Sequence, residues 1–500
     1  MGGIAAVGGL CAIPALDDAL GPRLRFGVVS DVHIGGRKEA PLRLAFALRW
    51  LRARGVDAVL FPGDIAHTGR ISQMEEFARI WFEVFPEGLG LDGRKVELMI
   101  STGNHDAWTL GYDKASEADR RANWLVYGDN LPRTWRRLFG LAWAPVWRRA
   151  VKGYVFMGSE WPTLKPDLEG YMREHCAEFD RSKPFFHCQH EHPKDTCHGA
   201  YGCGWDQGQA ARAFADFPNA VVFSGHSHCS LADERTIWQG AFTSVGAGCL
   251  HEGGGSFDYE NISAFWHPSF KTHVMAPMND SAQWGGDPDG GCFELVEVFD
   301  DCLRIERRSS VWDLPIGPAW TVPLPARTKG SYDHARLAAA SRPPTFPSSA
   351  TVSVAYCPNG HPQAGASFGR TACVHLAFPS AGCGKGRRRV FDYEVRAVAP
   401  DGRSVVRKIM APGFSVPEEK SNRPVDCLFL LSELPSADGV VFKVTPRDCF
   451  GNCGPAITSE RFVARVVPAF TMRIDDNQSV ADWRRVAEIF EIVRVPGANL

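Results

Sequence analysis

Residues 24–33 read LRFGVVSDVH, an apolar run of strand type that ends in Asp31 and His33. The next segment, 41–54, carries leucines at helical spacing. A strand that leads into an amphipathic helix is the repeating unit of layered α/β proteins. The stretch therefore predicts an α/β domain with polar side chains at the carboxyl end of its first strand.

The alternation of strands and helices continues along the first half of the chain. The predicted strands are 24–30, 58–61, 96–101, 154–158, 184–188 and 220–224. A capping box of Ser72 and Glu75 predicts the start of a second helix. Residues 293–307 predict a terminal hairpin with its turn at Asp300-Asp301.

Five short motifs stand directly after predicted strands. They are Asp31-Val32-His33, Gly63-Asp64, Gly103-Asn104-His105-Asp106, His190-Glu191-His192-Pro193 and Gly225-His226-Ser227-His228. Because ligands gather beyond the carboxyl ends of the strands in an open α/β sheet, we expect these motifs to converge on one place. Their mixture of oxygen and nitrogen donors suits divalent Mn, Fe, Co, Ni or Zn better than Ca.

The number of donors predicts two metal ions. The candidate ligands are Asp31, His33, Asp64, Asn104, His190, His226 and His228. They are too many for one tetrahedral zinc that keeps an open position. With one carboxylate as a bridge they divide into two half-shells, which water or substrate oxygens complete.

In order and spacing, the five motifs resemble those of the calcineurin-like metallophosphoesterase superfamily, over about residues 24–310. The resemblance implies a four-layer α/β/β/α sandwich with a dinuclear metal centre of Mn, Fe or Zn. It implies the following allocation: Asp31, His33 and His228 on one metal, Asn104, His190 and His226 on the other, and Asp64 as the bridge. The implied activity is hydrolysis of a phosphomonoester or phosphodiester by a metal-activated water, on a small molecule or a phosphorylated partner.

The resemblance also assigns His105 and Asp106. His105 stabilises the transition state or protonates the leaving oxygen, and Asp106 orients the His105 ring. The allocation agrees with elementary chemistry, because two cations about 3.5–4 Å apart clamp a phosphoryl group. Asn104 is a neutral donor, which limits the negative charge in a site that accepts an anion.

Two positions depart from the family pattern. Family members usually place the fourth motif's ligand two residues before a proline, where this chain has Glu191. His190 is our choice because it lies nearer the strand end, and His192 remains the alternative.

The other departure is His67, three residues after Asp64, where purple acid phosphatases carry a tyrosine. A ferric tyrosinate centre is therefore disfavoured, and the local pattern is closer to members that include cyclic-nucleotide phosphodiesterases. His67 then lies near the phosphate or the leaving group and joins Asn104 and His105 in binding substrate. The alternative is an ordinary loop histidine.

Composition excludes several classes of protein. Fifty-five Lys and Arg against 57 Asp and Glu leave a net charge of −2, so no electrostatic footprint for nucleic acid is present. A hydrophobic share of 44% and a charged share of 22% are typical of folded globular domains. No apolar run reaches the ~18–20 residues that span a bilayer. The sequence does not identify the ester that is cleaved, and it does not indicate an oligomeric state.

The sequence does not determine the cellular compartment of the protein. Residues 1–20 are small and apolar without a basic start, so they are either a signal remnant or an N-terminal arm. The 15 cysteines are either disulfide-bonded or buried thiols, and their number favours a secreted or periplasmic location over the cytoplasm.

The rest of the chain predicts further parts. After the catalytic domain at 21–312 we expect a proline-rich linker at 313–349, a fibronectin type III-like β-sandwich at 350–470 and a helical tail at 471–500. Within the first domain, the Trp- and Arg-rich insertion at 107–150 either packs on the domain or forms a lid or substrate wall. Residues 252–290 predict a long loop that shapes the pocket.

A second function remains open. The chain could be a binding or adhesion protein in which the metal centre is vestigial, because fibronectin-like domains often bind sugars or proteins. Against this, each of the five motifs still offers a residue that binds metals. For the C-terminal domain alone, binding a partner and packing on the catalytic domain are equally open.

Overall fold

The structure is a computed structural model. It describes residues 21–109, 111–197, 206–250, 289–325, 330–361, 371–383 and 389–464. The predicted pocket loop at 252–290 lies almost entirely outside these residues, and so do the predicted N-terminal arm and C-terminal tail. In the described ranges, no helix combines the length and the apolar character needed to cross a bilayer.

The first sheet is built around the strand with which the sequence opened. Its six strands, in spatial order, are β12 (Trp320–Pro323), β11 (Cys302–Ser309), β10 (Cys292–Val298), β1 (Leu24–Val28), β2 (Ala58–Pro62) and β3 (Glu97–Ser101). Strands β1, β2 and β3 are parallel, whereas β10 to β12 are antiparallel to their neighbours. The predicted hairpin at 293–307 is present as β10 and β11.

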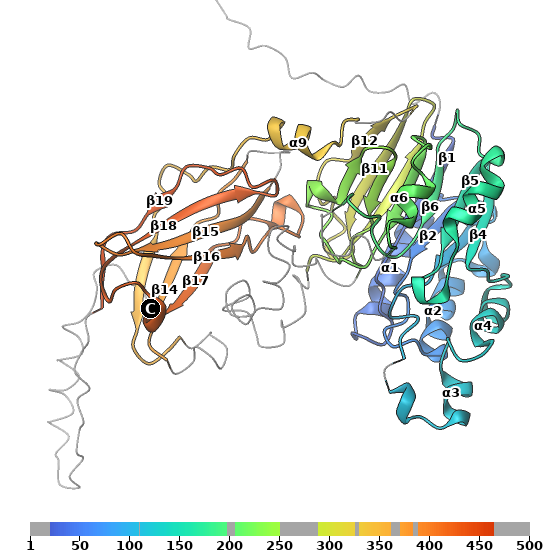
Figure 1. Cartoon of the computed structure of the whole chain (residues 1–500), viewed down its shortest axis with the longest axis horizontal. Helices are drawn as coiled ribbons and strands as arrows, with labels where there is room; N and C mark the ends of the chain where they lie inside the picture. The colour runs from blue at the N-terminus through green and yellow to red at the C-terminus, as the bar shows by residue number, and fades with distance from the viewer. Residues whose placement is uncertain are drawn as a thin grey trace, which may run out of the picture. The chain divides into compact units, whose positions relative to one another are not determined.

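The second sheet has the same mixed character. Its order is β4 (Val146–Val151), β5 (Tyr154–Ser159), β6 (Phe185–Cys188), β7 (Ala220–Ser224), β9 (Thr243–Gly246) and β8 (Ile237–Gln239). Strands β5, β6, β7 and β9 are parallel, and the two edge strands are antiparallel. The two sheets lie face to face (Figure 1).

Phe26 on β1 shows how the sheets pack against each other. It is fully buried, and its ring contacts Phe156, Phe186 and Phe223 on β5, β6 and β7, with centroids 5.1, 4.7 and 5.7 Å away. Because these three strands belong to the other sheet, the contacts join the inner faces of both sheets.

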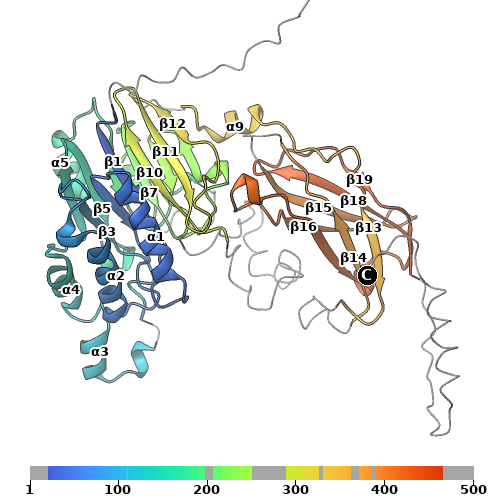
Figure 2. The same ribbon diagram turned by 180° about the vertical axis from the view of Figure 1, so that it is seen from behind.

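Helices cover both outer faces. The helices α1 (Ala40–Ala53), α2 (Ile71–Val84) and α4 (Asn130–Phe139) share one apolar cluster with the first sheet. The helices α5 (Leu168–His175) and α6 (Gln209–Ala213) share another with the second sheet. Figure 2 shows α1 and α2 side by side on their sheet. The predicted four-layer α/β/β/α sandwich is confirmed.

The start of α2 differs from the expectation. The helix begins at Ile71, so Ser72 is not its N-cap and the predicted capping box with Glu75 is wrong. Gln73 serves the same purpose, because its Oε1 accepts hydrogen bonds from the backbone amides of Thr68 (3.0 Å) and Arg70 (3.4 Å). A side chain in the first turn thus satisfies amides that precede the helix.

The insertion at 107–150 contains α3 (Glu117–Asn123), α4 and the edge strand β4. Trp135 on α4 is buried in the apolar cluster of α1 and α2. Trp124 is also buried, with the guanidinium of Arg70 3.4 Å from its ring centroid. Helix α4 and Trp124 therefore pack on the domain, which is the first of the two alternatives given for this insertion.

The range predicted as a linker, 313–349, contains regular structure. β12 pairs with β11, so the first sheet extends beyond the expected boundary at residue 312, and α9 (His334–Ala340) follows. Because of the prolines at 318 and 323, the sequence did not indicate a strand at β12. An edge strand tolerates proline because one of its sides needs no ladder hydrogen bonds.

The C-terminal region is all-β, as predicted. One antiparallel sheet holds β13 (Ser353–Cys357), β14 (Cys373–Phe378) and β17 (Val425–Leu430). The other holds β16 (Ser404–Met410), β15 (Val390–Val398), β18 (Asp438–Asp448) and β19 (Ile457–Thr458), in that order. A further strand, β20, spans Phe462–Val463. The sequence analysis did not predict strand β16. The likeness to fibronectin type III remains a prediction.

No disulfide bond joins two cysteines within the described ranges. Nine of them are buried: Cys188, Cys197, Cys229, Cys249, Cys292, Cys302, Cys373, Cys427 and Cys449. The sequence left open whether the cysteines are disulfide-bonded or buried thiols. These nine residues are buried thiols.

Glu294 on β10 is an exception within the core. It is fully buried, and among the described residues neither of its carboxyl oxygens has a hydrogen-bond partner. Burial, opposed by the charge of Arg307, raises the pKa of Glu294 well above its usual value. The folded chain therefore keeps a proton that the unfolded chain releases, and this group lowers stability as pH rises from about 4.5 toward its folded pKa.

We expect Glu294→Gln to cancel this pH dependence, because an amide is neutral throughout. The free energy of unfolding of the variant relative to wild type should rise with pH above about 4.5, by up to about 1.4 kcal/mol per pH unit. Urea unfolding between pH 5 and pH 8 measures the difference. Glu174→Gln, at an exposed position on α5, is the control. A difference that does not vary with pH contradicts the prediction.

Candidate metal centre

The five motifs follow five strands of the two sheets. Asp31 and His33 follow β1, Asp64 follows β2, Asn104 follows β3, His190 follows β6, and His226 and His228 follow β7. The structure brings all seven side chains into one site.

Five of the seven predicted ligands have left-handed backbone conformations. The φ angles are 53° at Asp31, 51° at His33, 52° at Asp64, 67° at His226 and 54° at His228. Such conformations cost roughly 1–3 kcal/mol each and persist where the surrounding structure enforces them. Here the His33 amide donates to the Asp64 carbonyl (3.0 Å) and the Ile34 amide to the Ile65 carbonyl (2.8 Å).

Asp31, His33 and His228 form the first group of donors. The Nε2 atoms of His33 and His228 lie 3.1 Å apart, and Asp31 Oδ1 lies 3.2 Å from His228 Nε2. Two nitrogens bound to one metal at about 2.0–2.1 Å are themselves about 3 Å apart. The group therefore has the spacing of ligands around a single cation.

Asn104, His190 and His226 form the second group. Asn104 Oδ1 lies 3.0 Å from both His190 Nε2 and His226 Nδ1. His190 Nδ1 donates to the carbonyl of Pro62 (2.7 Å). This bond orients the ring so that Nε2 faces Asn104 and the other members of the group.

Asp64 lies between the two groups. Its Oδ2 is 3.1 Å from His190 Nε2 and 3.8 Å from His33 Nε2. Its Oδ1 accepts the backbone amide of His105 (2.8 Å). The carboxylate thus lies within 4 Å of a ring nitrogen from each group.

The electrostatics of the site favour positive charge. Asp31 and Asp64 are both buried, and burial opposes their ionisation. The neighbouring histidines outweigh burial, so the pKa of each carboxyl lies below its usual value. Burial lowers the pKa of His190, but Asp64 outweighs it and raises the pKa to about 10. Two ionised carboxylates with nitrogen and amide donors fit divalent cations.

The structure separates His190 from His192. Both ring nitrogens of His192 are engaged by serines, Nε2 with Ser227 Oγ (2.7 Å) and Nδ1 with Ser224 Oγ (2.6 Å). Burial lowers the pKa of His192 to about 4. His190, and not His192, therefore lies among the ligand candidates.

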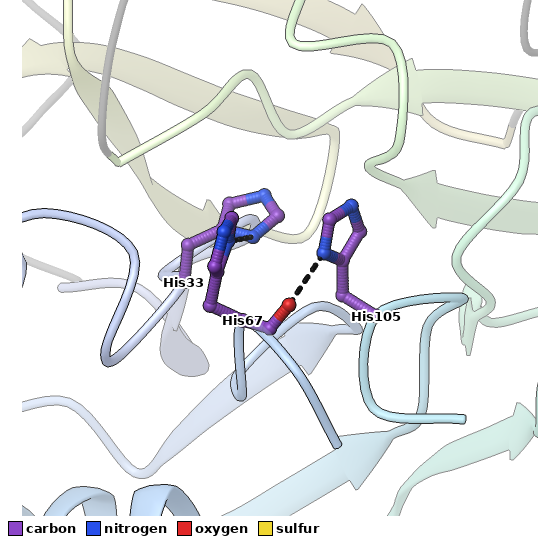
Figure 3. Close-up of side chains that lie close together, drawn as sticks. All are labelled: His33, His67 and His105. Carbon is purple, nitrogen blue, oxygen red and sulfur yellow. Dashed lines mark hydrogen bonds between the residues drawn. The ribbon is translucent and has the colours of Figure 1, made fainter. Parts of the chain in front are cut away.

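His105 and His67 lie beside the first group (Figure 3). His105 Nδ1 donates to the backbone carbonyl of His67 (2.7 Å), so Nε2 is the ring atom left for substrate. The His67 ring stacks on the His105 ring, with centroids 5.1 Å apart and planes at 29°. Burial, together with the charge of His105, lowers the pKa of His67.

The role predicted for Asp106 is wrong. Its carboxylate accepts the backbone amides of Ala66 (2.7 Å), Gly103 (2.9 Å) and Ile65 (3.3 Å). The His105 ring is oriented by the His67 carbonyl instead. Asp106 therefore ties the turns after β2 and β3 together and does not orient His105.

Sequence reasoning missed three neighbours of the site. Trp161 is buried with its ring 5.7 Å from that of His190 and 5.5 Å from that of His226. Cys249 Sγ donates to the backbone carbonyl of Asp31 (3.4 Å), and the ring centroids of Trp108 and His105 are 4.3 Å apart. Trp161 and Cys249 follow the strands β5 and β9, so their place at a strand end was the available signal.

Gly63 allows the second group to form. Its φ is +85°, and a Cβ there would lie 2.4 Å from His190 Nδ1 and 2.8 Å from the Gly103 amide nitrogen. We expect Gly63→Ala to displace the His190 ring and to weaken metal binding at this group at least about 10-fold. Metal content after dialysis measures the loss.

Gly93→Ala is the matched control for Gly63→Ala. Gly93 has a φ of +75°, and a Cβ there would meet nothing within 4 Å, so the change strains the backbone alone. Equal metal content in the two variants contradicts the prediction.

A comparison with protein-family models matches the part of the chain that carries this site. Residues 24–230 match the model of the calcineurin-like phosphoesterase family. A search of curated proteins gives no significant match. Residues 24–230 are therefore similar to the calcineurin-like phosphoesterase family, and the predicted hairpin lies beyond the matched part.

Several solved structures are similar. A dimetal phosphatase from Danio rerio is 11% identical, covers 60% of this chain and 99% of its own, and has a TM-score of 0.37. Purple acid phosphatase PPD1 from yellow lupin (Lupinus luteus) seeds is 13% identical, covers 60% and 53%, and has a TM-score of 0.35. Vacuolar Protein Sorting 29 from Cryptosporidium parvum is 12% identical, covers 60% and 97%, and has a TM-score of 0.29.

Proposed function

We propose that this chain is a metal-dependent hydrolase that uses two divalent cations to cleave a phosphomonoester or phosphodiester. The observation that carries the proposal is the pair of donor groups that share Asp64. When bound, the two cations polarise the phosphoryl group and activate the attacking water. Asp31, His33 and His228 hold one cation, and Asn104, His190 and His226 hold the other.

The surrounding residues bind and orient the ester. His105 presents Nε2 to a phosphoryl or leaving oxygen, since its Nδ1 is held by the His67 carbonyl. In its protonated form it donates a proton to the leaving oxygen. Asn104 contributes a donor without charge, and Trp161 excludes water beside His190 and His226.

The proposal is tested on the full chain, stripped with a chelator and reloaded with Mn(II), Fe(II) or Zn(II). We expect metal-dependent hydrolysis of an aryl phosphate or a bis-aryl phosphate. His105→Ala should lower turnover by about 10²–10⁴-fold while two metals per chain remain bound. His175→Ala, on the outer helix α5, is the matched control.

Two results would overturn the proposal. One is the failure of every reloaded form to cleave either ester. The other is full activity in His105→Ala. The first result would favour the adhesion alternative, although the convergence of all seven predicted ligands supports an intact centre.

A further inference from the structure

His67 has contacts that its expected place near the substrate does not explain. Its ring is held on three sides, by His33, His105 and the backbone of Gly36. A Cβ on Gly36 would lie 2.7 Å from His67 Nδ1. The backbone fixes the ring as well, because the His67 amide donates to the Ile34 carbonyl (3.0 Å).

The contact between His33 and His67 joins the two Nδ1 atoms, which are 3.3 Å apart (Figure 3). His33 Nε2 faces His228 and Asp31, so Nε2 is the atom that His33 gives to a cation. A neutral imidazole that binds a metal through Nε2 carries its hydrogen on Nδ1. His33 Nδ1 is therefore the donor and His67 Nδ1 the acceptor, which places the hydrogen of His67 on Nε2.

We propose that His67 is a positioning residue that holds the tautomer and the ring plane of the metal ligand His33. Metal-binding histidines commonly donate their second nitrogen to a carboxylate, a carbonyl or water, and such partners tune metal affinity. His67 supplies this acceptor without a negative charge, which suits a site that receives an anionic ester. The inference rests on the proposed metal centre.

A third cation is the rival explanation, because the donor atoms of His33, His67 and His105 also lie within 4.8 Å of one another. That arrangement requires His33 to bind two cations through both of its nitrogens, and to lose its Nδ1 hydrogen. The number of metals per chain separates the two explanations.

The test measures Zn(II) affinity of the full chain by competition with a chromophoric chelator. We expect two Zn(II) per chain in wild type. In His67→Leu, which has no acceptor, one of the two sites should weaken about 10–100-fold and the other should stay unchanged. His67→Asn offers an amide oxygen near the position of Nδ1 and should restore most of the affinity.

Two further variants make the result specific. His187→Leu removes a buried histidine of β6 whose Nε2 contacts Ser159 and Gln189, and it should leave both sites unchanged. Gly36→Ala keeps His67 but pushes its ring, so it should weaken the same site as His67→Leu. It also provides a second measurement if His67→Leu does not fold.

Unchanged Zn(II) affinity in both His67→Leu and Gly36→Ala overturns the inference, and metal-dependent hydrolysis by wild type then leaves the proposed function standing. Three Zn(II) in wild type and two in His67→Leu establish the third cation instead. A wild-type chain that binds no metal overturns both the inference and the proposed function.

Discussion

Asp64→Asn is expected to empty both halves of the metal centre and to lower kcat/KM by about 10³-fold or more. Asp64 is the carboxylate whose Oδ2 approaches ligands of both groups, at 3.1 Å from His190 Nε2 and 3.8 Å from His33 Nε2. A metal pair supplies several kcal/mol of charge stabilisation in the transition state, and each 1.4 kcal/mol is tenfold in rate. An asparagine keeps the shape of the side chain and an acceptor for the His105 amide, so the fold should persist.

Metal analysis and steady-state kinetics of the same preparations measure both effects. Asp57→Asn is the matched control, because Asp57 directly precedes β2 at its opposite end and pairs there with Arg94 (2.8 Å) and Lys152 (2.7 Å). Loss of those ion pairs should lower stability and leave metal content unchanged. Undiminished turnover in Asp64→Asn with two metals bound disproves the bridging role.

Phe26→Ala is expected to lower the free energy of unfolding of the first domain by about 3–5 kcal/mol. The fully buried Phe26 ring fills the space between the sheets and contacts Phe156, Phe186 and Phe223. Truncation loses this burial and leaves a cavity that two packed sheets close poorly.

Urea unfolding of the full chain, followed by tryptophan fluorescence, measures the loss. Phe82→Ala on α2 removes the same ring from a position that is 39% exposed, and it should cost far less. Equal losses in the two variants would contradict a central role of Phe26 between the sheets.

The strands and the convergence of seven polar side chains at their ends were predictable for one physical reason. The strands β1, β2 and β3 end two or three residues before Asp31, Asp64 and Asn104, and the carboxyl ends of parallel strands meet at one edge. Pattern and chemistry therefore agreed at each strand end. The packing of the insertion at 107–150 was harder to predict. Trp124 and Trp135 indicate burial, but the sequence does not show which surface they pack against.

Other features depended on three-dimensional contacts. Asp106 follows His105 in sequence, yet its carboxylate turns to the amides of Ala66 and Gly103. His190 and His192 are similar in sequence context, and their contacts distinguish them: His190 Nε2 lies 3.0 Å from Asn104 Oδ1, whereas serines engage both ring nitrogens of His192. The hydrogen bond between His33 and His67 joins two loops and has no counterpart in local spacing.

The left-handed turns at the metal centre link the choice of residue to the shape of the loop. Asp and His tolerate positive φ better than most side chains, and both also coordinate cations. Valine or isoleucine at Asp31 or His228 would thus remove a donor and distort its turn at once. Glycine is the exception, since it accepts the turn and offers no donor. Glycine replacements at these positions are therefore the direct way to obtain a folded chain with individual ligands deleted.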